Sequence, residues 1–282
     1  MPDFSSFSHF KVTSPSKYVL HVEVARPQKL NSFAPTTWRQ LGDIFNLISS
    51  DSRVRAVILS GAGDRAFTSG LDLSPETLAL LSGTVKGEEP LEEERLRFYK
   101  HRVIKDFQDS ISAVEKCRKP VIGLAHGVSY GLAIDILCAA DIRICTSTVR
   151  FSIKEVDIAL AADIGTLQRF PKIVSSQSWF KELAYTAREF GSAEAERHGF
   201  VSFVATDKQD AFEKALQLAT LIARKSPVAV QGSKHLINYS RDRPVQDGLD
   251  YTAAWNSFAL GTDIIQAATA AVSKKPIVFG NL

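Results

Sequence analysis

Residues 120–135 read PVIGLAHGVSYGLAID, which describes a short strand, a glycine-containing turn and the start of a helix. The apolar run from Pro120 to Ala125 has the length and composition of a buried strand. Gly127 and Gly131 allow the chain to turn, and the small residues from Gly131 to Ala140 favour a helix. A strand, a turn and a helix in this order are typical of an α/β protein with a parallel sheet.

Similar units lie on both sides of this stretch. Runs of apolar and β-branched residues predict further strands at 18–24, 54–60, 141–145 and 151–153. Helical spacing of apolar residues predicts helices at 36–49 and 95–117, with a surface loop between helical pieces over 75–95. After about residue 178 the pattern is almost entirely helical, and helices are expected at 179–186, 193–198, 210–224, 227–240 and 247–260. We therefore expect an α/β core over 1–200 and a helical region over 201–282, which contacts another subunit or covers a site.

The composition narrows the class of protein. The chain has 282 residues, with 34 Lys and Arg against 31 Asp and Glu, which gives a net charge of +3. So small a surplus of positive charge does not indicate nucleic acid as the partner. Three cysteines without Cys-x-x-Cys spacing and histidines without His-Glu-x-x-His spacing predict neither disulfides nor a metal site. No apolar run is long enough to span a bilayer.

Two turns could supply free backbone N–H groups to an anionic oxygen. The first, Ala66 to Leu73, follows a strand, and the second, His126 to Asp135, lies between a strand and a helix. Backbone N–H groups at such turns stabilise negative charge. From the residues alone, Asp72 is equally well explained as a local cap, and Asp135 as a carboxylate that favours the start of a helix.

A third stretch, Lys154 to Arg169, places Glu155 and Asp163 on either side of an apolar segment that also contains Asp157. An unpaired carboxylate in apolar surroundings is costly, so each acid needs a partner or a function. Burial raises the pKa of a carboxyl group toward neutrality, which suits proton transfer. On composition alone, a capping or ion-pair role is at least as good an interpretation of each acid.

Together the three stretches resemble the crotonase, or enoyl-CoA hydratase/isomerase, superfamily. Segments that carry the resemblance extend over most of the chain, at 26–33, 67–73, 119–122, 138–143, 154–169 and 186–201. The most specific is Ala161 to Arg169, AADIGTLQR, which resembles the signature of the dienoyl-CoA isomerase branch and is not shared by the hydratases. The resemblance implies a repeated ββα spiral core with a C-terminal helical trimerisation region.

The resemblance also implies an activity, the Δ3,5-Δ2,4 isomerisation of dienoyl-CoA in unsaturated fatty acid β-oxidation. Asp163 is expected to remove a proton from C2, Glu155 to deliver one to C6, and Asp135 to orient or polarise its neighbours. The backbone N–H groups of Leu71 and Leu132 are expected to form the oxyanion hole for the dienolate. No metal or redox cofactor is expected, and CoA is part of the substrate.

Further expectations concern the substrate, the assembly and the location. The residues expected to bind the acyl-CoA thioester are Lys29, Ser69, Gly70, Asp72 and Leu73, joined by Lys274 or Lys275 of a neighbouring subunit. The resemblance implies trimers that pair into a homo-hexamer. The C-terminal Gly280-Asn281-Leu282 ends in leucine without matching Ser-Lys-Leu. We expect a peroxisomal location, with the mitochondrion as the alternative.

The chain departs from the family pattern in the turn before Asp135. The family usually has Gly-Gly-Gly before the acid at 135, whereas this chain has Gly131-Leu132-Ala133. A positive φ at Leu132 would be strained, and the leucine side chain is expected to narrow the acyl tunnel.

Two other functions are alternatives to the dienoyl-CoA isomerase. The first is an enoyl-CoA hydratase or Δ3,Δ2-enoyl-CoA isomerase, which Asp163 disfavours. The second is a non-catalytic protein that binds acyl-CoA or RNA, which the retained acids disfavour.

Overall fold

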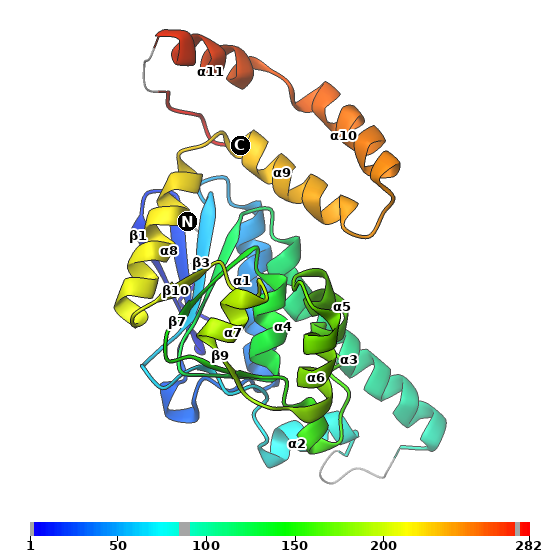
Figure 1. The fold of residues 1–282 in the computed structure, drawn as a ribbon. Coiled ribbons are helices and arrows are strands. Elements are labelled where there is room, and N and C mark those ends of the chain that lie inside the picture. Colours follow the sequence, from blue (N-terminus) through cyan, green and yellow to red (C-terminus); the bar gives the residue numbers. More distant parts are fainter. Residues whose placement is uncertain (1–2, 85–90, 274–276) are drawn as a thin grey trace.

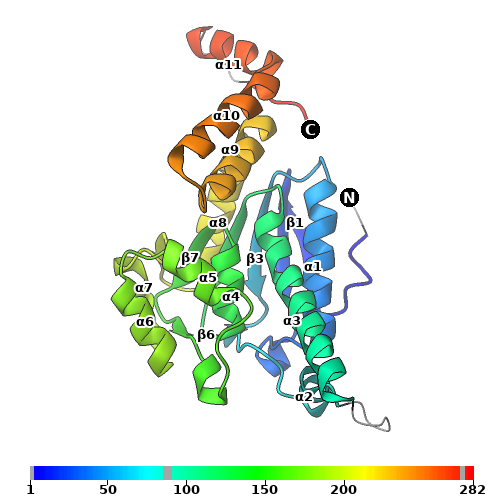
Figure 2. The same cartoon turned by 90° about the vertical axis from the view of Figure 1, so that its right-hand side faces the viewer.

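The structure is a computed structural model that describes residues 3–84, 91–273 and 277–282 (Figure 1). Lys274 and Lys275, expected to contact the substrate of a neighbouring subunit, lie outside the described residues. The described chain forms two sheets with helices on both faces of the larger one (Figures 1 and 2).

The larger sheet has six strands in the order β1-β2-β3-β5-β7-β10. Their bounds are β1 Phe10–Ser16, β2 Val19–Val24, β3 Ala56–Gly61, β5 Val121–Ala125, β7 Ile142–Thr146 and β10 Phe203–Ala205. All neighbours are parallel except β1 and β2. Every residue of β3 and β5 is buried, which explains their continuous apolar runs.

The smaller sheet contains β4 Ala66–Thr68, β6 Val128–Tyr130, β8 Arg150–Ser152 and β9 Phe190–Gly191. β3 and β4, β5 and β6, and β7 and β8 are consecutive pairs, in which the first strand joins the large sheet and the second joins the small sheet. Helices follow the first two pairs, so the expected repeat of two strands and a helix is present. This repeat brings the ends of β4, β6 and β8 together.

Helices cover the large sheet differently on its two faces. One face packs against α1 Pro35–Ser50, α3 Glu93–Lys116 and α4 Leu132–Ala139, and the other packs against α8 Lys208–Ala223. α8 presents a row of buried alanines at 211, 215, 219 and 223 to Ile58, Ile122 and Ile144. Because alanine side chains are small and recur every four residues, this helix can lie close to the strands.

The remaining helices are α2 Pro75–Ser82, α5 Thr166–Arg169, α6 Gln177–Thr186, α7 Ser192–Arg197, α9 Pro227–Ser240, α10 Val245–Ala259 and α11 Thr262–Ser273. Short 3-10 helices occupy η1 Pro27–Lys29, η2 Glu155–Ile158 and η3 Phe170–Lys172. α9, α10 and α11 extend away from the sheets (Figures 1 and 2). None of the helices in the described ranges combines the length and apolarity that crossing a membrane requires.

The predicted strands and helices of the first half are confirmed within a few residues. One expectation was wrong, because Pro75–Ser82 is a helix rather than a loop. The helices expected after residue 178 are confirmed as α6 to α10, with the short strands β9 and β10 among them. The boundary at residue 200 stays a prediction, although β10 and α8, which lie beyond it, pack on the core sheet.

A buried ion pair attaches α9 to the core. Lys234 Nζ donates to Asp141 Oδ2 at 2.7 Å and to the Lys119 carbonyl at 3.0 Å. Lys234 is 8% exposed and the Asp141 side chain 24% exposed, so the ammonium group in particular has little access to water. Removing one partner of such a pair leaves the other charge buried without compensation.

Replacing Lys234 with methionine is therefore expected to lower the free energy of unfolding by about 3 kcal/mol. Urea unfolding followed by circular dichroism measures the change. The matched control is Lys214→Met, which removes the more exposed ion pair with Asp210 on α8 and is expected to cost under about 1 kcal/mol. Equal losses in the two variants would contradict a stabilising role for the Lys234–Asp141 pair.

Candidate active site

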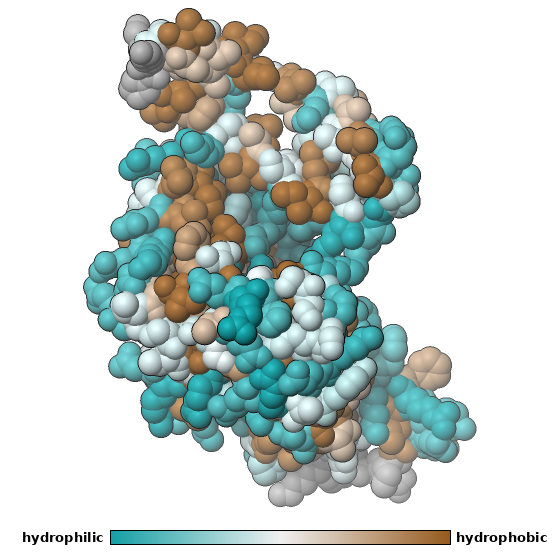
Figure 3. Space-filling view, in the orientation of Figure 1, coloured by the Kyte–Doolittle hydropathy of each residue, from teal (hydrophilic) through white to brown (hydrophobic). Residues whose placement is uncertain are grey.

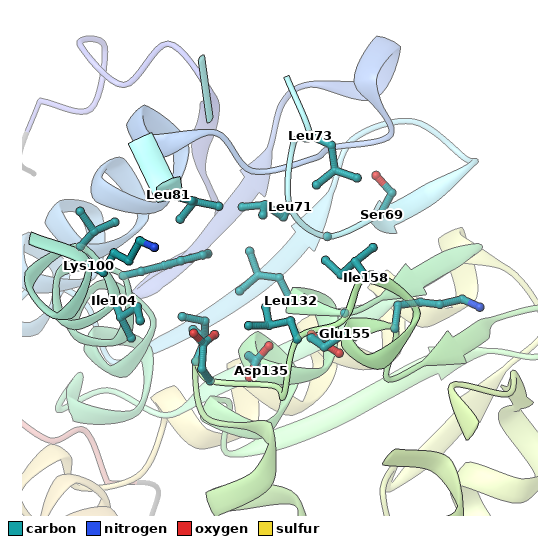
Figure 4. Close-up of a pocket in the computed structure, with 18 residues that line it drawn as sticks. Ser69, Leu71, Leu73, Leu81, Lys100, Ile104, Leu132, Asp135, Glu155 and Ile158 are labelled. Carbon is teal, nitrogen blue, oxygen red and sulfur yellow. The ribbon is translucent and has the colours of Figure 1, made fainter. Parts of the chain in front are cut away.

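A cavity of about 290 Å³ lies between α3, the loop after β4, the start of α4 and the segment that follows β8 (Figure 4). Most of its wall is apolar, with side chains of Leu73, Leu81, Val103, Ile104, Phe107, Leu132, Ile158, Leu160 and Ile164. The carboxyl groups of Asp135, Glu155 and Asp163 contribute polar groups to the same cavity. An apolar pocket with a few convergent polar groups is typical of a site for a small ligand.

Two glycine turns meet at one end of the cavity. Gly70 has a φ of 97° and Gly131 a φ of 54°, backbone conformations that favour glycine. A Cβ atom on Gly70 would lie 3.0 Å from the Tyr130 carbonyl oxygen and 3.7 Å from the Leu132 nitrogen. The absence of a side chain at Gly70 therefore lets the two turns approach each other closely.

This approach leaves two backbone N–H groups available. The backbone of Phe33 bonds to both neighbours of Leu71: it accepts from the Asp72 N–H at 2.9 Å and donates to the Gly70 carbonyl at 2.8 Å. In this parallel bridge the N–H of Leu71 therefore faces away from Phe33. Leu132 is the first residue of α4, where N–H groups have no acceptor within the helix. Among the described residues, neither N–H has a hydrogen-bond acceptor. Together they can hold one anionic oxygen.

Leu132 does not strain the backbone. The positive φ falls on Gly131, and Leu132 has the ordinary conformation of a first helical residue. The expected conflict between leucine and a positive φ at this position therefore does not arise. The Leu132 side chain lines the cavity, as the sequence predicted, beside Asp135 and Glu155 (Figure 4).

Asp135 is the most buried of the three acids, with 1% exposure. Its Oδ1 accepts hydrogen bonds from the backbone N–H of Thr166 at 2.6 Å and from the Thr166 hydroxyl at 2.7 Å. Burial raises the pKa of Asp135 to about 6, although the two bonds from Thr166 oppose the rise. Asp135 is therefore held in one orientation and still carries a charge at neutral pH.

Glu155 and Asp163 have fewer partners. Burial, followed by the negative charge of Asp135, raises the pKa of Glu155 to about 7. Its Oε2 atom is buried and has no hydrogen-bond partner among the described residues. Burial also raises the pKa of Asp163, whose backbone carbonyl accepts a bond of 2.7 Å from the Gln108 side chain. One neutral carboxyl group beside an ionised one provides an acid and a base in a single cavity.

The other predicted site residues divide into two groups. Ser69, Gly70 and Leu73 line the cavity, as do the oxyanion-hole candidates Leu71 and Leu132. Neither Lys29 nor Asp72 lines the cavity. Lys29 is exposed on η1. Asp72 instead pairs with Arg26 at 3.0 Å and accepts from the Ser74 N–H at 3.2 Å, as a local cap does. Their contacts with substrate stay predictions.

Sequence reasoning missed several residues that shape the site. Thr166 holds Asp135, Gln108 holds the Asp163 backbone, and Arg169 pairs with Glu115 at 3.0 Å. Lys100 of α3 also lines the cavity, at the end away from Glu155 (Figure 4). Polar residues on the inner face of an amphipathic helix were the available signal for Gln108 and Glu115.

The chain is similar to known proteins over most of its length. Residues 15–258 match the family model described as Enoyl-CoA hydratase/isomerase. The chain is 44% identical to the mouse (Mus musculus) protein "Delta(3,5)-Delta(2,4)-dienoyl-CoA isomerase, mitochondrial", over 98% of this chain and 84% of that protein. It is 39% identical to the Arabidopsis thaliana protein named as the peroxisomal form, over 92% of this chain and 91% of that protein.

Solved structures with the same arrangement were also found. A putative enoyl-CoA hydratase from Streptomyces coelicolor superposes with a TM-score of 0.85 at 27% identity, covering 99% of this chain and 96% of that chain. An enoyl-CoA hydratase from Bacillus anthracis gives a TM-score of 0.84 at 25% identity, with coverage of 96% and 99%. The arrangement of sheets and helices described above is therefore shared with these proteins.

Proposed function

The chain belongs to the enoyl-CoA hydratase/isomerase family, and we propose that it is a Δ3,5-Δ2,4-dienoyl-CoA isomerase of unsaturated fatty acid β-oxidation. The observation that carries this proposal is that three acids and two residues with available N–H groups line one cavity. Relatives that are 39% to 44% identical over nearly the whole chain and are named as this isomerase support it.

The reaction begins when the thioester oxygen of a 3,5-dienoyl-CoA accepts hydrogen bonds from the N–H groups of Leu71 and Leu132. The ionised carboxylate of Asp163 removes a proton from C2, and the C–H electron pair spreads over the thioester oxygen, C4 and C6. Because the two N–H groups are already in place, they stabilise this charge as it forms. The product at this stage is a dienolate bound to the enzyme.

The second step places a proton at C6. Neutral Glu155 gives its proton to C6, and the double bonds then lie at positions 2 and 4. Asp135 stays ionised, and its charge helps to keep the proton on Glu155. Asp163 then loses a proton to solvent and Glu155 gains one, which restores the starting state. These transfers need no metal or redox cofactor, and CoA is part of the substrate.

Ultraviolet absorbance tests the proposal against both alternatives. Mixed with a 3,5-dienoyl-CoA, the protein is expected to increase absorbance at longer wavelength, because the 2,4-dienoyl product is conjugated with the thioester. A hydratase would instead remove the absorbance of a 2-enoyl-CoA, and a non-catalytic acyl-CoA- or RNA-binding protein would change neither. No change with the 3,5-dienoyl-CoA would refute the proposed activity.

The turnover number is expected to depend on pH with a maximum. Activity falls as pH rises through about 7, because Glu155 loses the proton that it must donate. It also falls at lower pH, where Asp163 gains the proton that it must remove. Measuring kcat from pH 5 to 9 gives the fall in activity on both sides of the maximum.

The variant Asp135→Asn tests the cause of the fall at high pH. Loss of the charge beside Glu155 is expected to move that fall to lower pH. A rate that stays constant up to pH 9 would contradict a neutral Glu155.

We further propose that the protein forms trimers that pair into a hexamer. Apolar side chains on α10 and α11 support an interface there, because Phe258 is 91%, Val272 88% and Val245 79% exposed in the single chain. Figure 3 shows hydrophobic residues at the end of the molecule that carries these helices. Exposed apolar surface of this extent is typical of a protein interface. The mass in solution, measured by light scattering, tests the proposal.

For the location we propose the peroxisome, with the mitochondrion as the alternative. Relatives carry both names, since the mouse protein is named mitochondrial and the Arabidopsis protein peroxisomal. In the structure, Arg55 Nη2 donates to the carbonyls of Phe279 and Gly280, each at 2.8 Å. A receptor that reads residues 280–282 would have to release the bond to Gly280 and the bond of 2.9 Å from Arg55 Nη2 to Asn281 Oδ1. Imaging a fluorescent fusion with and without residues 280–282 tests whether they direct the protein to peroxisomes.

A further inference from the structure

Glu115 lies between two arginines from distant parts of the chain. Its Oε2 accepts from Arg169 Nε at 3.1 Å and Nη2 at 3.0 Å, and its Oε1 accepts from Arg241 Nη1 at 2.5 Å. The side chains of Glu115 and Arg169 are only 16% and 11% exposed. Burial alone would raise the pKa of Glu115, but the bonds and charges of the two arginines hold it below its ordinary value. Glu115 is therefore an ionised and sheltered partner for Arg169.

Glu115 belongs to a polar row on the inner side of α3. Gln108, Ser112 and Glu115 follow one another at intervals of about one helical turn. Gln108 donates to the Asp163 carbonyl at 2.7 Å, and Ser112 Oγ accepts from Arg169 Nη2 at 2.9 Å. The row thus holds the segment 163–169 at its first residue and at its last.

The same segment carries the groups that orient the carboxylates of the site. Asp163 begins it, and Thr166 within it donates both bonds to Asp135. Gly165 has a φ of 140°, and a Cβ atom there would overlap the guanidinium of Arg169. The turn is therefore shaped around Arg169, although Arg169 does not line the cavity.

We propose that Glu115, acting through Arg169, is a positioning residue that holds the segment 163–169 so that Asp163 and Asp135 face the substrate. The inference rests on the proposed isomerase function. Proton transfer requires the carboxylate to be within hydrogen-bond reach of C2, and a misplacement of about 1 Å can cost about 100-fold in rate. Arg169, paired with Glu115, fixes the position of the segment although it does not line the cavity itself.

The chain offers a matched control. Arg241 bonds to the other oxygen of Glu115 and is the residue that ends α9, and it makes no hydrogen bond or ion pair with the described residues of the segment 163–169. Glu115→Gln weakens both ion pairs, whereas Arg241→Gln removes only the one that leads away from the site. A role in anchoring α9 would affect the two variants alike, but a role in positioning would affect only the first.

The experiment compares these variants with the full-length wild-type protein in the 3,5-dienoyl-CoA absorbance assay. Glu115→Gln is expected to lower kcat by about 10- to 100-fold with KM within about threefold, whereas Arg241→Gln keeps kcat within about threefold. Glu115→Gln combined with Arg169→Gln is expected to lose no more than the worse single variant, because both act through one contact. Gly165→Ala, which displaces Arg169 without removing a charge, is expected to resemble Glu115→Gln.

Two results would overturn the inference: Glu115→Gln with kcat within threefold of wild type, or equal losses of kcat in Glu115→Gln and Arg241→Gln. Melting temperatures of all variants identify a loss due to unfolding, and Gly165→Ala then tests the placement without deleting the ion pair. A crystal structure of Glu115→Gln gives a readout that does not depend on turnover, with Thr166 expected to move away from Asp135. If the wild-type protein does not convert the dienoyl-CoA, the proposed function fails, and this structure still tests the positioning.

Discussion

Replacing Asp163 with asparagine is expected to reduce kcat for 3,5-dienoyl-CoA isomerisation by about 10²- to 10⁴-fold, because the base that removes the C2 proton is lost. Asparagine has nearly the same shape and cannot accept that proton at neutral pH. The apolar wall and the Leu71 and Leu132 N–H groups are unchanged, so KM is expected to stay within a few-fold. Steady-state kinetics from the absorbance of the conjugated product measure both quantities.

A neighbouring acid provides the control for this variant. Asp157 lies on η2, before Asp163 in the chain, is exposed and pairs with Lys154 at 3.0 Å. Asp157→Asn is expected to leave kcat within about twofold of wild type, since its carboxylate does not line the cavity. Retained turnover in Asp163→Asn would refute the assigned base, and a similar loss in both variants would point to a general effect of charge.

Replacing Glu155 with glutamine is expected to lower isomerisation by a similar factor while leaving the first step intact. Asp163 can still remove a C2 proton, so the variant is expected to exchange C2 hydrogen with D₂O without forming product. Mass spectrometry of the recovered substrate measures this exchange. Asp163→Asn is expected to lose exchange as well as isomerisation. Loss of exchange in Glu155→Gln would contradict the division of roles between the two acids.

The same substitution is expected to change stability with pH. The pKa of Glu155 lies near 7 in the folded protein, above its ordinary value near 4.5, so between these pH values the folded state binds more protons than the unfolded state. The contribution of Glu155 to stability therefore falls as pH rises through this range. Glutamine does not titrate. The free energy of unfolding of Glu155→Gln, relative to that of wild type, is therefore expected to rise by on the order of 2 kcal/mol from pH 5 to pH 8. Urea unfolding at the two pH values measures the difference.

The sequence predicted the large sheet better than the small one. Strands such as β3 and β5 are continuous apolar runs because both faces are covered, and such runs are visible in a sequence. β4, β6 and β9 have only two or three residues each, so no periodicity can develop within them. Their pairing depends on strands that are distant in the sequence.

The predictions for the site were also uneven, because the acids were identified and the contacts between distant residues were not. The three acids were grouped through the family resemblance, and the structure places them around one cavity. Asp72 was expected to bind substrate, and that contact stays a prediction; its pairing with Arg26, which lies far from it in sequence, was not predicted. Whether the positive φ falls on residue 131 or 132 could not be read from the sequence, and the structure places it on Gly131. The contact between Glu115 and Arg169 joins residues far apart in sequence, so only the fold reveals it.

Isomerisation carried out in D₂O tests the central claim most directly, because it shows where the proton at C6 comes from. If Asp163 removes the C2 proton and Glu155 separately delivers another, the 2,4-dienoyl-CoA formed from unlabelled 3,5-dienoyl-CoA carries deuterium at C6, because Glu155 regains its proton from solvent. Nuclear magnetic resonance of the product locates the label. Product without deuterium at C6 would mean that a single group carries the proton from C2 to C6, and would contradict the separate roles assigned to Asp163 and Glu155.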